Sequence, residues 1–326
     1  MKKLLFICPH LSTGGQPQYT LKMVEEFKKQ FNVEVIEVNN YSDDYTVQRD
    51  KISKLVKLHQ LKGDQKSLLR LLNDGKTKEL DDSTILHFQE LPESFIDDSI
   101  LRELYKPTRN YTMVVTTHSS LTKPGDFRYI PDRVVAVNEW QKNVFKGLTD
   151  TAVWEYPIEN KYKGYSEKEK YFEKLENKYN LLKLCNKLPE GIDEATQLHL
   201  EYLLNNITCT LNVGLFTPGK NQGELFEIAR MDPNNLYHFV GNQAGNFKDY
   251  WEPLMRNKPD NCIIWGEQKD LDLFYKGCDL FYFASKFELN PIVIKEALSY
   301  DLPIMMRRLD TYGDYYDNND MVTYIN

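Results

Sequence analysis

The 326-residue sequence lacks the features that mark membrane-spanning and nucleic-acid-binding proteins. No apolar stretch approaches the ~18 residues of a membrane-spanning helix, and the apolar run after Met1 is too short for a signal peptide. Acidic residues outnumber basic ones by 48 to 41, and the net charge of -7 gives no support to a general nucleic-acid binder. We therefore expect no transmembrane segment and no nucleic acid as a partner.

Cysteine is scarce, and its pattern predicts neither disulfides nor a metal site. There are five cysteines and no C-x-x-C, and most of them lie in or beside apolar runs typical of strands. This pattern favours buried free thiols in a reducing compartment, so the expected localisation is cytoplasmic. Zinc-site spacing, a P-loop and a G-x-S-x-G elbow are all missing from the sequence. We expect no metal and no resident cofactor.

The length and composition are those of a folded protein with two domains. Hydrophobic residues make up 41% and aromatic residues 13% of the chain, enough for a sizeable core. Short apolar runs alternate with helical patterns and short connections, which predicts α/β domains with doubly wound parallel sheets. Strands are expected at 4–8, 33–38, 85–88, 113–117, 134–137 and 152–154, and again at 207–213, 236–240, 262–265, 279–283, 302–306 and 322–325.

The two halves are separated by a segment of different character. We predict an N-terminal Rossmann-like domain over 1–158, a helical linker or insertion over 159–206 and a C-terminal Rossmann-like domain over 207–326. The middle segment is rich in lysine, but acids are interleaved with the lysines, which favours a solvated helix over one lying on a membrane. A peripheral membrane contact stays open. Within the first half, 47–74 reads as two helices broken near Gly63.

The most informative stretch is 285–298, which reads S-K-F-E-L-N-P-I-V-I-K-E-A-L. Pro291 suits the start of a helix, so Glu288 is expected in the loop before the helix and Glu296 inside it. The N–H groups at such a helix start favour an anion such as a diphosphate. The alternative is two exposed acids that flank an ordinary helix. The preceding G-C-D-L-F-Y-F-A-S of 277–285 predicts a strand that leads into this loop.

These two stretches resemble the strand and E-x7-E element of retaining GT-B glycosyltransferases, especially family 4. The resemblance implies a GT-B fold, with two Rossmann-like domains that face a cleft. It also implies that Glu296 hydrogen-bonds the ribose of a nucleotide-sugar donor and that Glu288 contacts the donor sugar. The amides of Leu289 and Asn290 would contact phosphate or sugar.

A second stretch, V-G-L-F-T-P-G-K-N-Q at 213–222, resembles the G-R-x-x-x-x-K-n loop of the same family. Lys220 matches the phosphate-binding lysine, and Gly214 matches the glycine, while Gly266 follows a later strand of the same domain. Leu215 stands where the family has arginine. The substitution removes one cation from the expected diphosphate site; the candidate substitutes are Arg307, Arg308 and Lys286.

The first half offers weaker signals at strand ends. Gly14 and Gly15 follow the first strand, and glycines there let a backbone approach a ligand closely. The resemblance implies that this loop lies against the donor phosphates and the acceptor, and a plain turn explains the two glycines nearly as well. His118 follows another strand and can donate a hydrogen bond to a sugar or phosphate, or be a capping or core residue. Asp270 and Asp272 form a D-x-D that suggests a metal, but their place at a helix start explains them better.

The resemblance implies a hexosyltransferase-like enzyme of carbohydrate biosynthesis. It would move a sugar from a UDP- or GDP-sugar to a glycan, glycolipid or other hydroxyl acceptor, with retention and without metal, using Glu288, Lys220 and His118 at the reacting groups. The acceptor would bind the N-terminal domain. A catalytically weak or inactive sugar-binding or assembly subunit is the alternative from another class, and an epimerase or phosphorylase of the same fold is a further one. Related folds usually continue with a last helix, so three alternatives stay open: a truncated chain, one part of a longer protein, or a variant of the fold.

Overall fold

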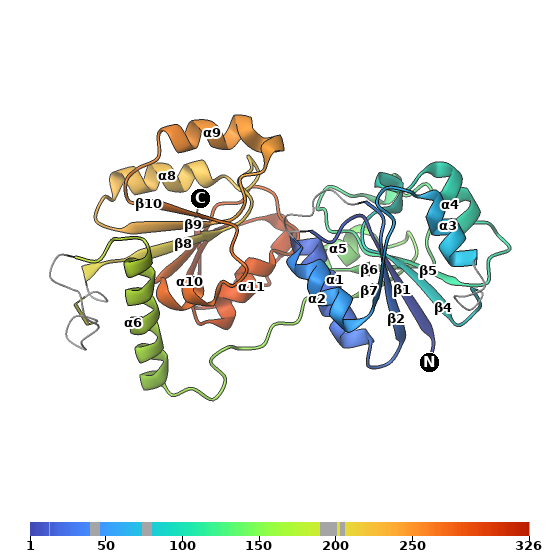
Figure 1. The fold of residues 1–326 in the computed structure, drawn as a ribbon, viewed down its shortest axis with the longest axis horizontal. Helices are drawn as coiled ribbons and strands as arrows, with labels where there is room; N and C mark the ends of the chain where they lie inside the picture. The colour runs from blue at the N-terminus through green and yellow to red at the C-terminus, as the bar shows by residue number, and fades with distance from the viewer. Residues whose placement is uncertain (13, 40–45, 74–79, 190–200, 203–205, 326) are drawn as a thin grey trace. The chain divides into compact units, whose positions relative to one another are not determined.

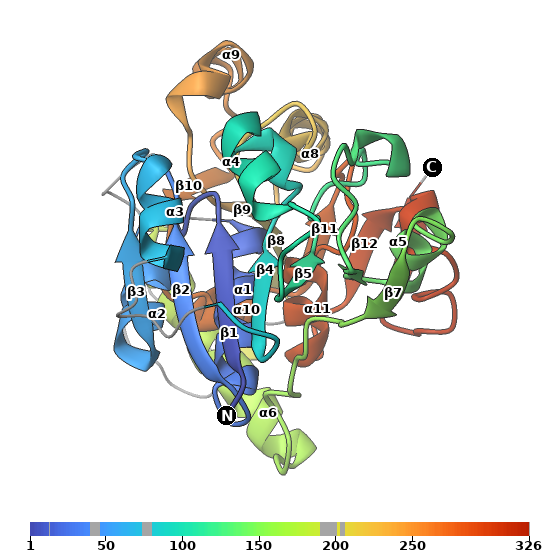
Figure 2. The same ribbon diagram turned by 90° about the vertical axis from the view of Figure 1, so that its right-hand side faces the viewer.

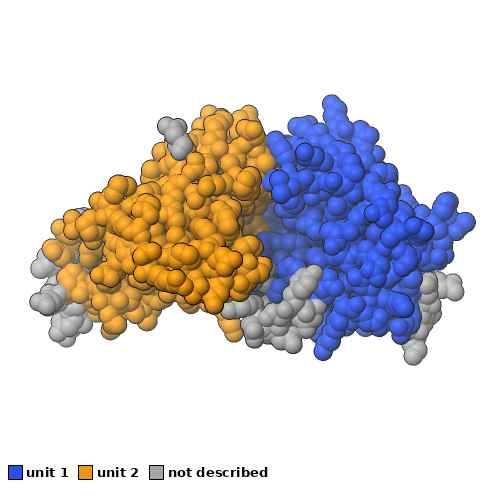
Figure 3. Space-filling model, turned by 90° about the horizontal axis from the view of Figure 1, so that it is seen from above, with its two compact units in different colours: residues 1–157 blue, residues 158–326 orange. Residues whose placement is uncertain are grey.

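The computed structural model describes residues 1–12, 14–39, 46–73, 80–189, 201–202 and 206–325. The chain forms two compact units, Met1–Pro157 and Ile158–Asn326, which Figure 3 shows in different colours. Each unit is built around one parallel sheet flanked by helices. We describe each unit by itself.

The N-terminal unit has a seven-stranded sheet in the order β3-β2-β1-β4-β5-β6-β7. Figure 2 shows β2, β1, β4 and β5 side by side. The order reverses between β1 and β4, where ligands of open α/β sheets bind. The strands are β1 Lys3–Cys8, β2 Asn32–Glu37, β3 Lys57–Gln60, β4 Thr84–Phe88, β5 Thr112–Val115, β6 Arg133–Ala136 and β7 Asp150–Val153.

Helices cover both faces of this sheet (Figure 1). Buried leucines of α3 and α4 pack with strand residues such as Leu5, Leu86 and Met113 on one face. Burial of each such side chain stabilises the fold by about 1.5–3 kcal/mol. The helices of this unit are α1 Gly15–Phe27, α2 Val47–Leu55, α3 Lys66–Asn73, η1 Pro92–Ser94, α4 Asp98–Leu104, η2 Pro124–Asp126 and α5 Glu139–Val144.

Strand β3 corrects the interpretation of 47–74 as two helices broken only near Gly63. The two helices are present as α2 and α3, but β3 lies between them and pairs in parallel with β2, with Glu34 opposite Lys57. Lys57 and Gln60 are exposed, and the two residues between them are half-buried. Its pairing to the sheet edge, rather than its apolar spacing, decides the conformation.

The C-terminal unit has a six-stranded parallel sheet in the order β10-β9-β8-β11-β12-β13. On β11 the side chains alternate, so that Phe281 and Phe283 face one core cluster and Tyr282 faces the other. The elements are β8 Cys209–Val213, α8 Gln222–Met231, β9 Leu236–Val240, η3 Gly245–Phe247, α9 Lys248–Arg256, β10 Cys262–Gly266, α10 Asp272–Gly277, β11 Leu280–Phe283, α11 Ile292–Ser299, β12 Ile304–Arg307, η4 Asp310–Tyr312 and β13 Val322–Ile325.

Helix α6, Glu167–Leu184, is the described helix of the segment predicted as a linker, and it packs onto the C-terminal unit. A capping box of Ser166 and Glu169 begins it. A methyl group at Gly277 of α10 would lie 3.0 Å from the backbone of Asn177, a tighter contact than most Cβ atoms make, so glycine favours this close approach of the two helices. Lys178, which is only 1% exposed, donates to Asp279 at 2.8 Å. The helix predicted around 198–204 falls mostly outside the described residues.

Candidate functional site

The loops after β8 and β11 meet where the order of the C-terminal sheet reverses. Lys220, from the loop after β8, forms an ion pair with the carboxylate of Glu288, from the loop after β11. The Lys220 ammonium also lies 5.2 Å from the centre of the Phe283 ring. The two side chains are 29% and 14% exposed, so the pair is largely shielded but still reachable from solvent. The structure thus brings together two of the residues singled out in the sequence.

Three glycines shape the edge of the sheet beside this ion pair. Gly214, Gly241 and Gly266 lie at or just after the ends of the neighbouring strands β8, β9 and β10, and all have positive φ. Gly214 donates its N–H to Val240 at 2.9 Å, and Gly241 donates to Gly266 at 2.8 Å. A methyl group on Gly241 would lie 2.0 Å from the Gly214 carbonyl oxygen, a distance that only glycine avoids. The edge therefore presents bare backbone.

The loop that carries Glu288 is fastened on two sides. The Lys286 N–H donates to the Gly219 carbonyl at 2.7 Å, which joins the loops after β8 and β11. The Thr311 hydroxyl donates to the Glu288 carbonyl at 2.7 Å, which joins the second loop to the segment after β12. These bonds fix the backbone of Glu288 independently of its ion pair.

Helix α11 begins just after this loop. Pro291 is its N-cap residue, and it contributes no N–H, so amide donors at this end come from neighbouring residues. Leu289 is buried and Asn290 half-buried. Glu296 lies in the second turn and accepts a hydrogen bond from Tyr275 at 2.9 Å. Tyr275 in turn stacks on Tyr300 with the ring centres 5.2 Å apart.

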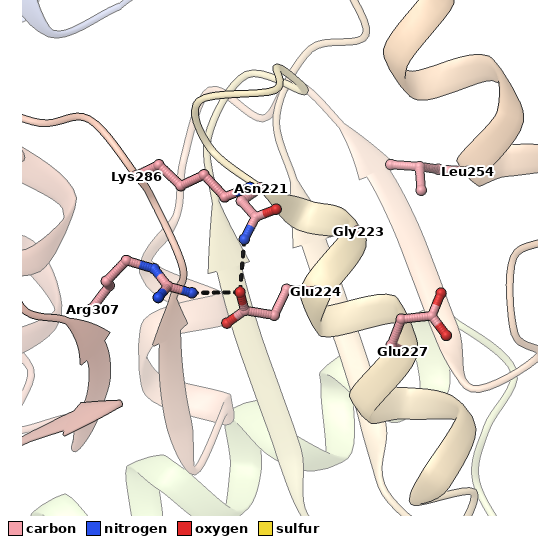
Figure 4. A pocket seen from close by; sticks show the side chains of 7 residues that line it. All are labelled: Asn221, Gly223, Glu224, Glu227, Leu254, Lys286 and Arg307. Atoms are coloured by element: carbon pink, nitrogen blue, oxygen red, sulfur yellow. Dashed lines mark hydrogen bonds and ion pairs between the residues drawn. The ribbon is translucent and has the colours of Figure 1, made fainter. Parts of the chain in front are cut away.

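The three cations considered as substitutes for an arginine at Leu215 differ in their partners. Arg307 donates to Glu224 at 2.6 Å, and Arg308 forms two hydrogen bonds with Asp317. Lys286 is exposed, and its ammonium forms no ion pair with any residue in the described part of the chain. Figure 4 shows Lys286 and Arg307 at an open pocket of about 680 Å³, which is lined by Asn221, Gly223, Glu224, Glu227, Leu254, Lys286 and Arg307.

The residues predicted in the first half lie at the carboxyl edge of the N-terminal sheet. Gly14, with φ 119°, caps α1, and Gly15 is the first residue of that helix. His118 follows β5, and its ring packs edge-on against Tyr19 with the ring centres 4.8 Å apart. Burial lowers the pKa of His118 to about 3, so the ring is neutral near pH 7. Its buried Nε2 atom has no hydrogen-bond partner among the described residues.

Neither a metal cluster nor a membrane span was found in the part of the chain that the structure describes. No group of three or more His, Cys, Asp or Glu side chains there is arranged to hold a metal ion. Asp270 instead accepts a hydrogen bond from the N–H of Asp272, and Asp272 forms one with the Tyr300 hydroxyl. None of the described helices is both long and apolar enough to cross a membrane. The five cysteines, all of them in the described ranges, are free thiols.

The sequence of the C-terminal unit is similar to a known protein family. Residues 205–321 match the family model described as glycosyl transferases group 1. The likeness to this family concerns the C-terminal unit. The match covers Gly214, Lys220, Gly266, Glu288 and Glu296, so the candidate site lies wholly within it.

Two curated relatives match part of the chain. The processive diacylglycerol alpha-glucosyltransferase of Acholeplasma laidlawii is 27% identical over 136 residues, which are 41% of this chain and 40% of the relative. The alpha-galactosylglucosyldiacylglycerol synthase of Streptococcus pneumoniae (strain ATCC BAA-255 / R6) is 28% identical over 138 residues, which are 40% of this chain and 37% of the relative. The match therefore spans about two fifths of the length of these relatives.

Solved structures resemble the whole chain in fold. Anabaena HepE, solved in complex with UDP and glucose, is 12% identical with a TM-score of 0.72, covering 100% of this chain and 86% of that one. A glycosyltransferase from Rickettsia africae is 16% identical with a TM-score of 0.66, covering 99% of this chain and 84% of that one. At these identities the likeness shows the fold, and it confirms the prediction of two Rossmann-like domains of the GT-B type.

Sequence reasoning missed the residues that support the site from outside the motifs. Tyr275 holds the carboxylate of Glu296, and Thr311 holds the backbone of Glu288. The sequence carries no signal for Tyr275, which lies in an ordinary helix. The only available signal for Thr311 and Tyr312 was their place in the segment that follows the predicted strand 302–306, because loops after strands of such sheets carry ligand contacts.

Proposed function

We propose that this chain is a glycosyltransferase that takes a hexose from a nucleoside diphosphate sugar, with the donor held by the C-terminal unit. The observation that carries the proposal is the pairing of Lys220 with Glu288 at the point where the sheet order reverses. At this position the Lys220 ammonium can give up the Glu288 carboxylate and bind the diphosphate of a donor instead. The sequence match to group 1 glycosyl transferases supports the same assignment.

Each part of the donor has a matching group. The backbone edge of Gly214, Gly241 and Gly266 allows close approach of the nucleotide, and Glu296 is the group for the ribose hydroxyls. Lys220 takes the diphosphate and Glu288 the sugar. Preorganised donors of this kind stabilise the charge that develops on the leaving diphosphate. Because a lysine supplies the positive charge, we infer that transfer proceeds without a metal ion, and that it should persist in EDTA.

The acceptor belongs to the N-terminal unit in this proposal. Neutral His118, with a buried Nε2 that has no partner among the described residues, is suited to a hydrogen bond with a sugar or acceptor hydroxyl. The names of the curated relatives refer to diacylglycerol glycolipids, so a lipid-linked or glycan hydroxyl is the acceptor class to test first. We propose that transfer retains the anomeric configuration. We also propose that the enzyme is cytoplasmic, and the free thiols support this localisation.

The test is a calorimetric titration with UDP, UDP-glucose, GDP and GDP-mannose, followed by NMR detection of the released or transferred sugar. Lys220→Met should weaken both the nucleotide and the nucleotide sugar, whereas Glu288→Gln should weaken only the nucleotide sugar. Lys248→Met, at an exposed position on α9, is the matched control and should bind as the wild type does. Absence of binding by the wild-type chain to every member of the panel would refute the donor site. Binding without any transfer or hydrolysis would instead favour the sugar-binding subunit.

A further inference from the structure

The segment after β12 contains a buried hydroxyl group that the donor site as described so far does not use. Tyr312, the last residue of η4, is 6% exposed and packs in the core cluster of the C-terminal unit. Its hydroxyl has no hydrogen-bond partner among the described residues. A hydroxyl buried without a partner is destabilising, so its retention here calls for a physical reason.

The neighbouring residue places this segment directly against the site. The Thr311 hydroxyl donates to the carbonyl of Glu288 at 2.7 Å, so the segment is fastened to the same residue whose carboxylate pairs with Lys220. Burial raises the pKa of Tyr312, and the negative charge of Glu288 raises it further. Tyr312 is therefore a protonated hydrogen-bond donor near Glu288 at any pH at which a protein of this kind works.

We propose that Tyr312 is a positioning residue for Glu288 in the donor-bound enzyme, with Thr311 as its anchor. This inference rests on the proposed function. In the unliganded structure the Glu288 carboxylate is held by the Lys220 ammonium. When the diphosphate of a donor takes Lys220, Glu288 loses its cationic partner. The hydroxyl of Tyr312 then donates to the carboxylate and keeps it directed at the sugar.

This change of partner of Glu288, from Lys220 to Tyr312, explains why a hydroxyl without a hydrogen-bond partner is kept in the core. A diphosphate bound to Lys220 competes with Glu288 for the same ammonium group, and a largely buried carboxylate that loses its cation is costly. A neutral donor compensates for part of that cost and leaves the second carboxylate oxygen for a sugar hydroxyl. Hydrogen bonds to a charged group contribute about 1.5–3 kcal/mol, so loss of this one should reduce sugar-dependent affinity by at least about tenfold.

The variant to test is Tyr312→Phe, which removes the hydroxyl and keeps the ring. The matched control is Tyr316→Phe, since Tyr316 is also buried and its ring packs against that of Tyr312 with the centres 5.7 Å apart. UDP and UDP-glucose are titrated into each variant of the 326-residue chain, and melting temperatures are recorded. We expect Tyr312→Phe to melt at or above the wild-type temperature and to bind UDP within twofold of wild type. Its preference for UDP-glucose over UDP should fall at least about tenfold, while the control keeps the wild-type preference.

The outcomes separate this inference from the proposed function. A wild-type chain that binds neither UDP nor UDP-glucose overturns both. A wild-type chain that prefers UDP-glucose, together with a Tyr312→Phe variant that keeps the same preference, overturns only the role of Tyr312. If Tyr312→Phe binds UDP and UDP-glucose more weakly by the same factor, the role of Tyr312 is also overturned. That result would indicate general structural damage and not a misplaced Glu288 carboxylate.

Discussion

The close approach of Gly241 to Gly214 at the edge of the C-terminal sheet predicts that Gly241→Ala is destabilising. A Cβ atom at Gly241 would lie 2.0 Å from the Gly214 carbonyl oxygen and 2.5 Å from its carbon, and Gly241 has φ 150°. Contacts below about 3.0 Å do not occur for real Cβ atoms, so the two loops must separate by about 1 Å. Overpacking of this size costs about 1–3 kcal/mol, and the backbone conformation adds roughly another 1–2 kcal/mol.

The displacement should also reach the donor site. A Cβ at Gly214 would sit 3.5 Å from the aliphatic chain of Lys220, so the lysine rests on the glycine that must move. We therefore expect Gly241→Ala to lower the melting temperature of the C-terminal unit by roughly 4–20 °C, at about 2–4 °C per kcal/mol for a unit of this size. UDP binding by the folded variant should also weaken.

The control for this variant is Gly245→Ala, because a Cβ at Gly245 meets nothing within 4 Å. Thermal unfolding followed by circular dichroism, and calorimetric titration with UDP below the melting transition, measure both effects. If Gly241→Ala melts within 2 °C of Gly245→Ala and binds UDP as well, the close approach of the two loops is not what shapes this edge.

Three further predictions concern other parts of the chain. Burial lowers the pKa of His87 and of His118 from 6.5 to about 3, so below pH 6.5 the unfolded chain binds more protons than the folded chain. The free energy of unfolding of the N-terminal unit should therefore fall by up to about 1.4 kcal/mol per histidine for each pH unit below 6.5. Urea unfolding at pH 7 and pH 5 measures this, and equal stability at the two pH values would contradict it. Gly277→Ala should destabilise the C-terminal unit by about 1–3 kcal/mol by pushing α6 away, and an unchanged melting temperature would count against that packing. Lys286→Ala should weaken UDP binding several-fold, whereas Arg308→Ala, which removes an arginine already paired, should not; equal effects would rule out Lys286 as the substitute cation.

Local patterns in the sequence were enough to predict most of the fold. The alternation of apolar strands and amphipathic helices over 207–306 gave each strand from β8 to β12 within about two residues, because these elements are buried and short connections join them. β3 was missed because a polar strand at a sheet edge is stabilised by pairing with β2 and not by its own apolar pattern. The close approach of α6 to α10 at Gly277 also has no local signal.

The candidate site could be predicted only where one local motif carries it. Glu288 and Glu296 belong to one local stretch and Lys220 to one loop, so each could be proposed as a site residue from its own surroundings. The contact between them was not predictable, because the Lys220–Glu288 ion pair joins residues 68 positions apart in the sequence. The same holds for Tyr275, 21 positions from Glu296, and for Thr311, 23 positions from Glu288. Such contacts are set by the parallel sheet and appear only when the chain is folded.

The central claim is that Lys220 leaves Glu288 to bind the diphosphate of a nucleotide sugar. A crystal structure of the full chain with the tightest-binding donor of the panel measures this directly. The account predicts the Lys220 ammonium within about 3.2 Å of a diphosphate oxygen, with Glu296 at the ribose and Glu288 at the sugar. A donor bound elsewhere, or bound here with the Lys220–Glu288 ion pair intact, would contradict it.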